Sequence, residues 1–215
     1  MRLAVKLRSV GLASIGWGTP WTNGADIAAF RRPIKSEEGI RYEIIIPGSS
    51  FKGALRSAAH RVAKACGFNS CIGGRDGRRT CPVCAFFGFS GSSTPSAVRV
   101  SDFMPESEVK TIIMNRIRIE DSSMKVSEGG LFSEEYLLPG VVFSGVLEFF
   151  GTAIDQKSMG LLLLSLAELR TGRLGRRSLF DLKVEEDEEI RSLISGSEWL
   201  ELFEDLRRWL WREVL

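Results

Sequence analysis

The sequence predicts an α+β protein with a ferredoxin-like βαββαβ core, and three observations predict it. Short stretches of alternating apolar and polar residues, typical of strands, recur along the chain. Two longer stretches place apolar residues at helical spacing, and one follows the first strands while the other precedes the last strand. Finally, 44% hydrophobic and 26% charged residues are typical of a globular protein and exclude a disordered chain.

The first half of the chain supplies two predicted strands and the first helix. Residues 2–8 alternate between an apolar face and a basic face, as a half-buried strand does. Residues 11–41 are rich in Gly, Thr and Pro and predict a long irregular loop. Residues 42–46 predict a short strand, and a helix capped by Ser49 or Ser50 is expected to run to about Cys66.

The middle of the chain alternates strands with insertions. Residues 67–84 combine cysteines with Gly, Arg and Pro, so we expect no regular structure there. Strands are expected at 97–103, 112–119 and 141–150, and residues 120–130 predict a polar excursion from the sheet.

A second helix at 155–170, a Gly/Arg loop at 171–178 and a strand at 179–184 complete the predicted core. Apolar residues at helical spacing from Trp199 to Val214 predict a C-terminal helix. The sequence therefore predicts one domain over 1–215 with an RRM-like topology. Its insertions are expected at 11–41, at 66–90 as a zinc loop, and at 115–135 as a thumb-like β excursion.

The charges are divided unevenly along the chain. Residues 1–119 hold 18 basic and 8 acidic residues, whereas residues 120–215 hold 11 and 19. A basic half suits binding to a polyanion such as a nucleic acid, although mixing of both charges in the fold is the alternative. No apolar run approaches the roughly 20 residues that cross a bilayer, so we expect no membrane partner and a cytoplasmic location.

All four cysteines lie within 19 residues, at positions 66, 71, 81 and 84. Disulfides are rare in cytosolic proteins, and four thiolates fill the tetrahedral shell of a structural zinc. We therefore predict that Cys66, Cys71, Cys81 and Cys84 bind zinc, with His60 as an alternative ligand. Four free or redox-active thiols are the alternative.

Residues 47–56 (PGSSFKGALR) open the first predicted helix with small and hydroxyl residues. Free amides at a helix start, with the hydroxyls of Ser49 and Ser50 and the cations Lys52 and Arg56, would suit a phosphate. The Walker order of residues is absent, so a nucleotide-binding P-loop is excluded.

These residues resemble the helix-opening signature of the RAMP superfamily of CRISPR-associated proteins, in particular the backbone subunits of type III RNA-guided effector complexes. Further similarities follow in the same order along the chain, at residues 81–88 (CPVCAFFG), 98–102 (VRVSD), 130–135 (GLFSEE) with 139–143 (PGVVF), and 174–178 (LGRRS). The last of these stands in place of the superfamily's glycine-rich loop but differs from its commoner Gly-Phe-Gly form. The resemblance spans nearly the whole chain.

The resemblance implies binding of a CRISPR guide RNA and of complementary target RNA, in a filament with copies of the chain and with other effector subunits. The guide would be held through phosphates and 2′-hydroxyls, because base pairing reads the sequence. Candidate contacts are Arg116, Arg118 and Lys125 in the thumb-like excursion and Arg173, Arg176 and Arg177 in the Gly/Arg loop.

Asp26, the only acid between Met1 and Glu37, lies where target-cleaving backbone subunits carry their catalytic aspartate. The resemblance therefore implies an endoribonuclease that acts on target RNA and uses Asp26 with a divalent cation such as magnesium. The residues after Asp26 depart from the family's hydrophobic-Pro context, and loop aspartates often only form turns. Two alternatives stay open, namely a non-catalytic scaffold subunit and a stand-alone endoribonuclease that processes guide precursors through His60.

Overall fold

The computed structural model describes residues 1–16, 24–37, 39–71, 81–89, 95–150, 154–175 and 178–211. Its central sheet is antiparallel and has the strand order β4-β8-β1-β9. These strands are β1 (Arg2–Ser9), β4 (Val98–Val100), β8 (Val142–Phe149) and β9 (Phe180–Val184), and the short β5 (Met104–Pro105) also pairs with β8.

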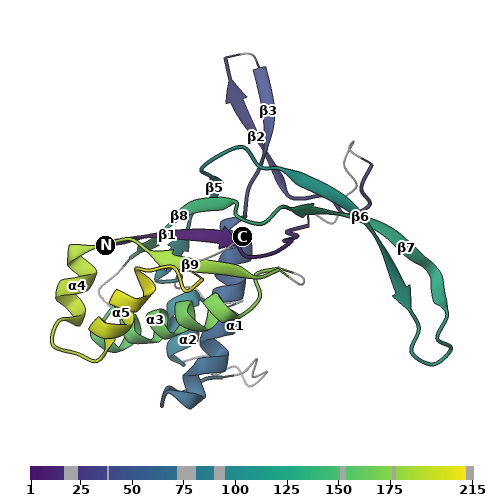
Figure 1. Cartoon of the computed structure of the whole chain (residues 1–215). Helices are drawn as coiled ribbons and strands as arrows, with labels where there is room; N and C mark the ends of the chain where they lie inside the picture. Colours follow the sequence, from purple (N-terminus) through teal and green to yellow (C-terminus); the bar gives the residue numbers. More distant parts are fainter. Residues whose placement is uncertain are drawn as a thin grey trace.

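The strand order confirms the predicted fold class. The first and third strands of the core, β1 and β8, lie in the middle of the sheet, and the second and fourth lie at its edges. Helix α1 (Gly48–Ala65) follows the first strand and α3 (Gln156–Thr171) follows the third. This is the ferredoxin-like arrangement, with both helices on the same face of the sheet (Figure 1).

The core lies between the sheet and these two helices. Alternate residues of β1 are buried, and the side chains between them are more exposed, as the sequence periodicity predicts. Helix α3 begins where expected, because the Asp155 carboxylate accepts the N–H of Ser158 and caps the first turn. Phe103 is completely buried and its ring lies 4.6 Å from that of Phe51 on α1.

Two hairpins extend from the sheet in different directions (Figure 1). One joins β2 (Arg31–Ser36) to β3 (Gly39–Ile44), and the other joins β6 (Thr111–Ile119) to β7 (Val126–Leu137). We call the β6–β7 hairpin the arm. The expectation of an irregular loop over 11–41 is therefore wrong for residues 31–36 and 39–41. The apolar alternation that marks a strand is weak there because most of these side chains face solvent.

The cysteine segment contains a short helix, α2 (Pro82–Phe87), where no regular structure was expected. The reason is local. Proline is favoured in the first turn of a helix, and the Cys81 side chain accepts the N–H of Cys84 as an N-cap.

The C-terminal region contains two short helices, α4 (Glu188–Ile194) and α5 (Trp199–Leu206). The helix predicted from Trp199 to Val214 thus begins where expected but ends early, at Leu206. The buried carboxylate of Asp181 on β9 explains the end, because it accepts the N–H groups of Leu210 and Trp211. This contact holds the chain after α5 against the sheet. Among the described helices, none is long and apolar enough to cross a membrane.

Candidate RNA-contacting site and cysteine cluster

Asp26 lies beside the half of the arm that is nearer to the central sheet, where its carboxylate contacts Ser133 of β7. The amide N–H of Ser133 donates to Oδ2 of Asp26 (2.7 Å), and the Ser133 hydroxyl donates to the same oxygen (2.8 Å). The hydroxyl oxygen also accepts the N–H of Asp26 (3.0 Å). The backbone and side-chain hydrogen bonds from Ser133 lower the pKa of Asp26 below its ordinary value. The exposed carboxylate is therefore ionised at neutral pH.

The chain after Asp26 runs alongside β7 and is bound to it at each step. The N–H of Ile27 donates to the carbonyl of Ser133 (3.0 Å), and the N–H of Glu135 donates to the carbonyl of Ile27 (2.9 Å). The Glu135 carboxylate then accepts the N–H of Ala29 (2.9 Å) and two hydrogen bonds from the Arg31 guanidinium (2.6 and 2.8 Å). Because residues two apart lie on one face of a strand, Ser133 and Glu135 together fix the segment that carries Asp26.

Glu135 is a buried carboxylate that stays charged. Burial acts to raise its pKa, but hydrogen bonds from Arg31, Ala29 and Thr111 and the charge of Arg31 outweigh burial and lower the pKa to about 2. A bidentate arginine–carboxylate pair of this kind is among the stronger charged hydrogen bonds. The Arg31–Glu135 pair thus anchors the start of β2 to the half of the arm that is nearer to the central sheet.

The arm carries three of the predicted RNA contacts. The Arg116 side chain lies over the Tyr136 ring (4.8 Å) and donates to its hydroxyl (3.0 Å), and the hydroxyl donates to Glu134. Arg118 is exposed and reaches the Ser127 hydroxyl at 3.5 Å, and Lys125 is exposed near the tip. Burial and the neighbouring Glu134 raise the pKa of Tyr136. Arg118 and Lys125 are open to a ligand, whereas Arg116 already has partners.

The start of α1 is built differently from the prediction. Its N-cap is Pro47 with no side-chain cap, and the N–H of Gly48 donates to the carboxylate of Asp102 (2.9 Å). The expected cap by Ser49 or Ser50 is therefore wrong, and both serines are exposed. A Cβ at Gly48 would lie 2.4 Å from the carbonyl oxygen of Val100, so only glycine allows this close approach.

The two α1 cations that were predicted to bind phosphate, Lys52 and Arg56, both have other neighbours in the fold. Lys52 donates to the Ser96 hydroxyl (2.6 Å) and the Val98 carbonyl (2.8 Å), which links α1 to the start of β4. Arg56 lies 3.9 Å from the sulfur of Cys84. With Asp102 already at the first amide, a phosphate at the helix start would have to displace a carboxylate.

The Gly/Arg loop packs on the chain that follows β1. The Ser178 hydroxyl accepts the N–H of Ser14 (2.7 Å) and donates to its carbonyl (3.0 Å), and Ala13 pairs with Leu137 at the end of β7. Arg173 is exposed, while Arg176 and Arg177 lie outside the described residues. The chain at Ala13 and Ser14 thus links this loop to the end of β7, the strand whose Ser133 contacts Asp26.

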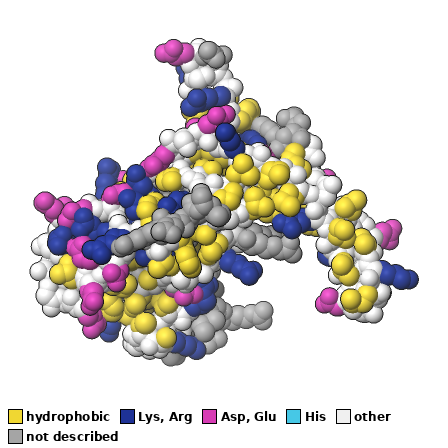
Figure 2. Space-filling view, in the orientation of Figure 1, with side chains coloured by type: hydrophobic (Ala, Val, Ile, Leu, Met, Phe, Trp, Pro, Cys, Tyr) yellow, Lys and Arg dark blue, Asp and Glu magenta, His cyan; other side chains and the backbone are white. Residues whose placement is uncertain are grey.

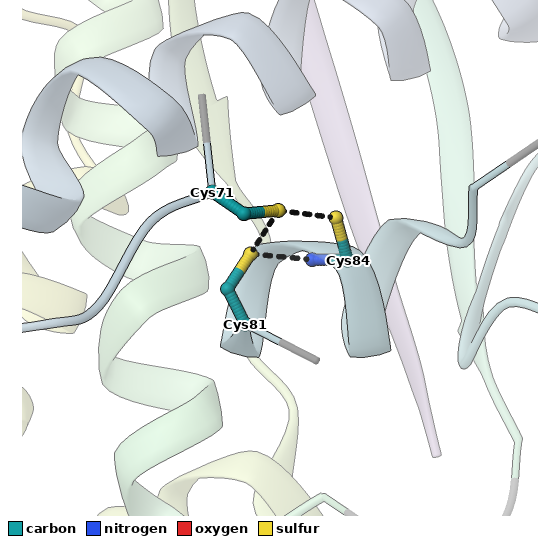
Figure 3. A group of neighbouring side chains, drawn as sticks. All are labelled: Cys71, Cys81 and Cys84. Carbon is teal, nitrogen blue, oxygen red and sulfur yellow. Dashed lines mark hydrogen bonds between the residues drawn. The ribbon is translucent and has the colours of Figure 1, made fainter. Parts of the chain in front are cut away.

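Three of the four cysteines come together beside α1 (Figure 3). The sulfur of Cys71 lies 3.1 Å from that of Cys81 and 3.0 Å from that of Cys84, and all three sulfurs lie within 4.8 Å of one another. Sulfurs around a tetrahedral zinc, each about 2.3 Å from the metal, stand about 3.8 Å apart. The three thiols therefore fit a zinc after a separation of less than 1 Å.

The charges of the cluster also fit a cation. Burial acts to raise the pKa of Cys81, but hydrogen bonds from Cys71 and Cys84 outweigh it and lower the pKa. Burial and the neighbouring sulfurs raise the pKa of Cys84 to about 12. Three thiolates packed this closely need a positive charge between them, which a bound cation would supply.

The fourth ligand is not in this group. Cys66 is the exposed C-cap residue of α1 and stands apart from the three other cysteines. His60 has its Nδ1 2.7 Å from the Ser70 hydroxyl, and burial, followed by the charge of Arg56, lowers its pKa. His60 lies on α1 and contacts Ser70, the residue before Cys71, and Cys66 directly follows the last residue of α1, so either remains a candidate for the fourth position.

Comparison with known proteins identifies the family. The model of the RAMP superfamily matches residues 19–180, which is most of the chain. The chain belongs to the RAMP superfamily. Among solved structures, this RAMP protein is similar to a chain described as "Type IV-B CRISPR Complex", with a TM-score of 0.61 and 17% identity over 86% of this chain and 90% of that chain. Among curated protein sequences, none matches.

The sequence alone missed three residues of this RAMP site. Ser133, Glu135 and Asp102 each bind a residue at least 54 positions away in the chain, so spacing could not identify them. The available signal was their position inside the matched stretches 98–102 and 130–135, where a polar residue follows a strand or interrupts one.

Proposed function

We propose that this RAMP protein is a guide-RNA-binding backbone subunit of a type III CRISPR effector complex and that it cleaves bound target RNA through Asp26. Membership of the RAMP superfamily and the similarity to a chain of a CRISPR complex support a CRISPR effector subunit. The observation that carries the proposal is the exposed, ionised carboxylate of Asp26, fixed by Ser133 next to the projecting arm.

The arm supports the RNA-binding part of the proposal. It projects from the body, and its exposed surface combines apolar side chains with the cations Arg118 and Lys125 (Figures 1 and 2). Apolar side chains can pack against unstacked bases or a neighbouring subunit, while cations contact phosphates. The exposed apolar residues are Ile112, Ile113, Ile117, Ile119, Met124, Val126 and Leu131.

The chemistry we propose is attack by a target 2′-hydroxyl on its own 3′-phosphate. The 2′-hydroxyl gives its proton to solvent and its oxygen bonds to phosphorus, while the bond from phosphorus to the 5′-oxygen breaks and the 5′-oxygen takes a proton from solvent. The products are a 2′,3′-cyclic phosphate and a 5′-hydroxyl. Such a step depends on in-line positioning and charge neutralisation more than on a catalytic triad.

Asp26 suits a positioning role in this step better than proton transfer. A general base works best with a pKa near the working pH, whereas hydrogen bonds from Ser133 lower the pKa of Asp26. Magnesium is typically held by one or two carboxylates together with substrate phosphates, so a single exposed carboxylate fits it. When bound, a divalent cation would neutralise charge on the scissile phosphate.

We also propose a structural zinc at the cysteine cluster. Cys71, Cys81 and Cys84 would supply three thiolates, and Cys66 or His60 the fourth ligand. A closed shell of protein ligands has no open position for substrate, so the metal would order the segment between α1 and α2 and take no part in cleavage.

The test is cleavage by the assembled complex of a matched target RNA, with and without magnesium. We expect cutting that stops on chelation, 2′,3′-cyclic phosphate ends, and resistance when the nucleotide at the cut carries a 2′-deoxyribose. Cleavage of the deoxy target, or cleavage unaffected by loss of the cation, would contradict the mechanism.

A scaffold subunit without chemistry is the second candidate, and one observation favours it. One oxygen of Asp26 is already bound to Ser133, as in a purely structural turn. This candidate predicts that the complex binds guide and target but leaves the target intact under all conditions tested. A stand-alone endoribonuclease that uses His60 predicts instead that the purified chain cuts repeat RNA without metal.

A further inference from the structure

We infer that Ser133 is a positioning residue for Asp26, and that it holds one carboxylate oxygen so that the other faces the RNA. This inference rests on the proposed function. Both donors of Ser133 bind Oδ2 of Asp26, and within the described chain no hydrogen bond is found to Oδ1. A carboxylate held at one oxygen by two donors can no longer rotate freely, so its second oxygen has a defined direction.

The Ser133 hydroxyl adds something that the backbone pairing does not supply. Ile27 and Glu135 already tie the two segments together through backbone hydrogen bonds, and Arg31–Glu135 adds a buried ion pair. The hydroxyl accepts from the Asp26 amide and donates to the Asp26 carboxylate, which closes a small ring around this one residue. The segment is thus anchored by other contacts, and the hydroxyl fixes the side chain.

The position of Ser133 also links the carboxylate to the arm. Ser133 pairs with Asn115 in the β6–β7 ladder, on the same two strands that carry Arg118 and the exposed apolar residues. A displacement of the arm when it contacts RNA would move Ser133 and with it Oδ2 of Asp26. We therefore expect target binding at the arm and cleavage at Asp26 to be coupled through this serine.

The test is single-turnover cleavage of target RNA by complexes assembled with Ser133→Ala, Ser133→Thr or Ser57→Ala. Ser57 is the matched control, because its exposed hydroxyl donates only to a carbonyl within α1. We expect Ser133→Ala to slow cleavage about 10- to 100-fold, the range for a misplaced catalytic group, with unchanged guide and target affinity. Threonine keeps the hydroxyl and is favoured in strands, so it should restore the rate.

Two outcomes would overturn the inference. One is cleavage by Ser133→Ala at the wild-type rate. The other is a loss that threonine does not restore and that weakens guide binding equally, which would show a structural role only.

A second measurement separates this inference from the proposed function. In the free protein, the amide proton of Ser133 should resonate downfield because it binds a carboxylate, and it should move upfield in Asp26→Ala. An unchanged resonance overturns the inference whatever the activity. A wild-type complex that leaves RNA intact overturns the proposed cleavage, and with it any effect of Ser133 on the cleavage rate, even where the resonance moves as expected.

Discussion

The sheet and the arm use similar apolar residues for different ends. Leu3, Val5 and Leu7 of β1 alternate with polar residues and are at most 1% exposed. Ile117 and Leu131 pair across the arm, yet they are 60% and 68% exposed. The apolar residues of the sheet are buried in the core, whereas those of the arm are exposed and can contact another molecule. Large exposed apolar patches of this kind mark interaction sites.

The largest expected effect is on the free energy of unfolding, which should fall much more for a substitution in the core than for one on the arm. Phe103→Ala removes a completely buried ring that packs on Phe51, and we expect it to lower the free energy of unfolding by about 3–5 kcal/mol. Ile117→Thr keeps a strand-favouring residue in an exposed position and should change it by less than about 0.5 kcal/mol. Urea unfolding of both variants measures the difference, and comparable losses would show that the arm is part of the core.

The cysteine segment is a part of the body that we expect to depend on metal. Purified without added metal, the protein should contain one zinc, and Cys81→Ser should contain almost none because Cys81 lies within the three-sulfur group. Cys66→Ser and His60→Ala, measured side by side, decide the fourth ligand, since only the ligand's loss should lower zinc content. Four titratable thiols and no zinc in the wild-type protein would contradict the site.

The ion pair of Glu135, where the arm joins the body, should make the free energy of unfolding depend on pH in the acid range. The pKa of Glu135 is about 2 in the folded protein and 4.5 ordinarily, so its contribution to stability is complete above pH 4.5 and is lost as pH falls toward 2. We expect up to about 3 kcal/mol of acid-dependent stability. Urea unfolding of wild type and Glu135→Gln between pH 2 and 6 should give curves that converge at the acid end. Parallel curves would show that Glu135 is not charged in the fold.

The smallest effect concerns the cations of the arm. Arg118→Ala and Lys125→Ala should each reduce the slope of log affinity against log salt by roughly 0.7 if each contacts one phosphate of a single strand. Lys64→Ala is a suitable control, because Lys64 is an exposed cation in the last turn of α1 and is not part of the arm. Slopes that match the wild type for both arm variants would remove the arm from the guide-binding surface.

The elements that the sequence predicted are those fixed by local patterns, and the elements it missed depend on contacts between distant residues. The strands β1, β6, β8 and β9 and both core helices were predicted because alternation and helical spacing are local. The same alternation in 112–119 could not show that the strand stands in solvent, since that depends on what packs against it. The β2–β3 hairpin and the end of α5 at Leu206 depend on distant partners, such as Glu135 and Asp181, and were missed.

The candidate site divides in the same way. Clustering in the sequence grouped all four cysteines, of which the structure brings together Cys71, Cys81 and Cys84. The resemblance pointed to Asp26, whose catalytic role stays a prediction. The resemblance did not reveal Ser133, and helix-start chemistry did not reveal that Asp102 occupies the first amide of α1. Contacts across 54 to 107 residues are set by the fold, which local patterns predict only in outline.

The most direct test of the central claim is target cleavage by a complex assembled with Asp26→Asn. Glu37→Gln is the matched control, because Glu37 is the next acid in the chain and is exposed beyond β2. We predict normal assembly and normal guide and target binding for both variants, a cleavage rate at least 100-fold lower for Asp26→Asn, and an unchanged rate for Glu37→Gln. Normal assembly of Asp26→Asn with cleavage at the wild-type rate would show that this subunit is a scaffold and that the nuclease lies elsewhere.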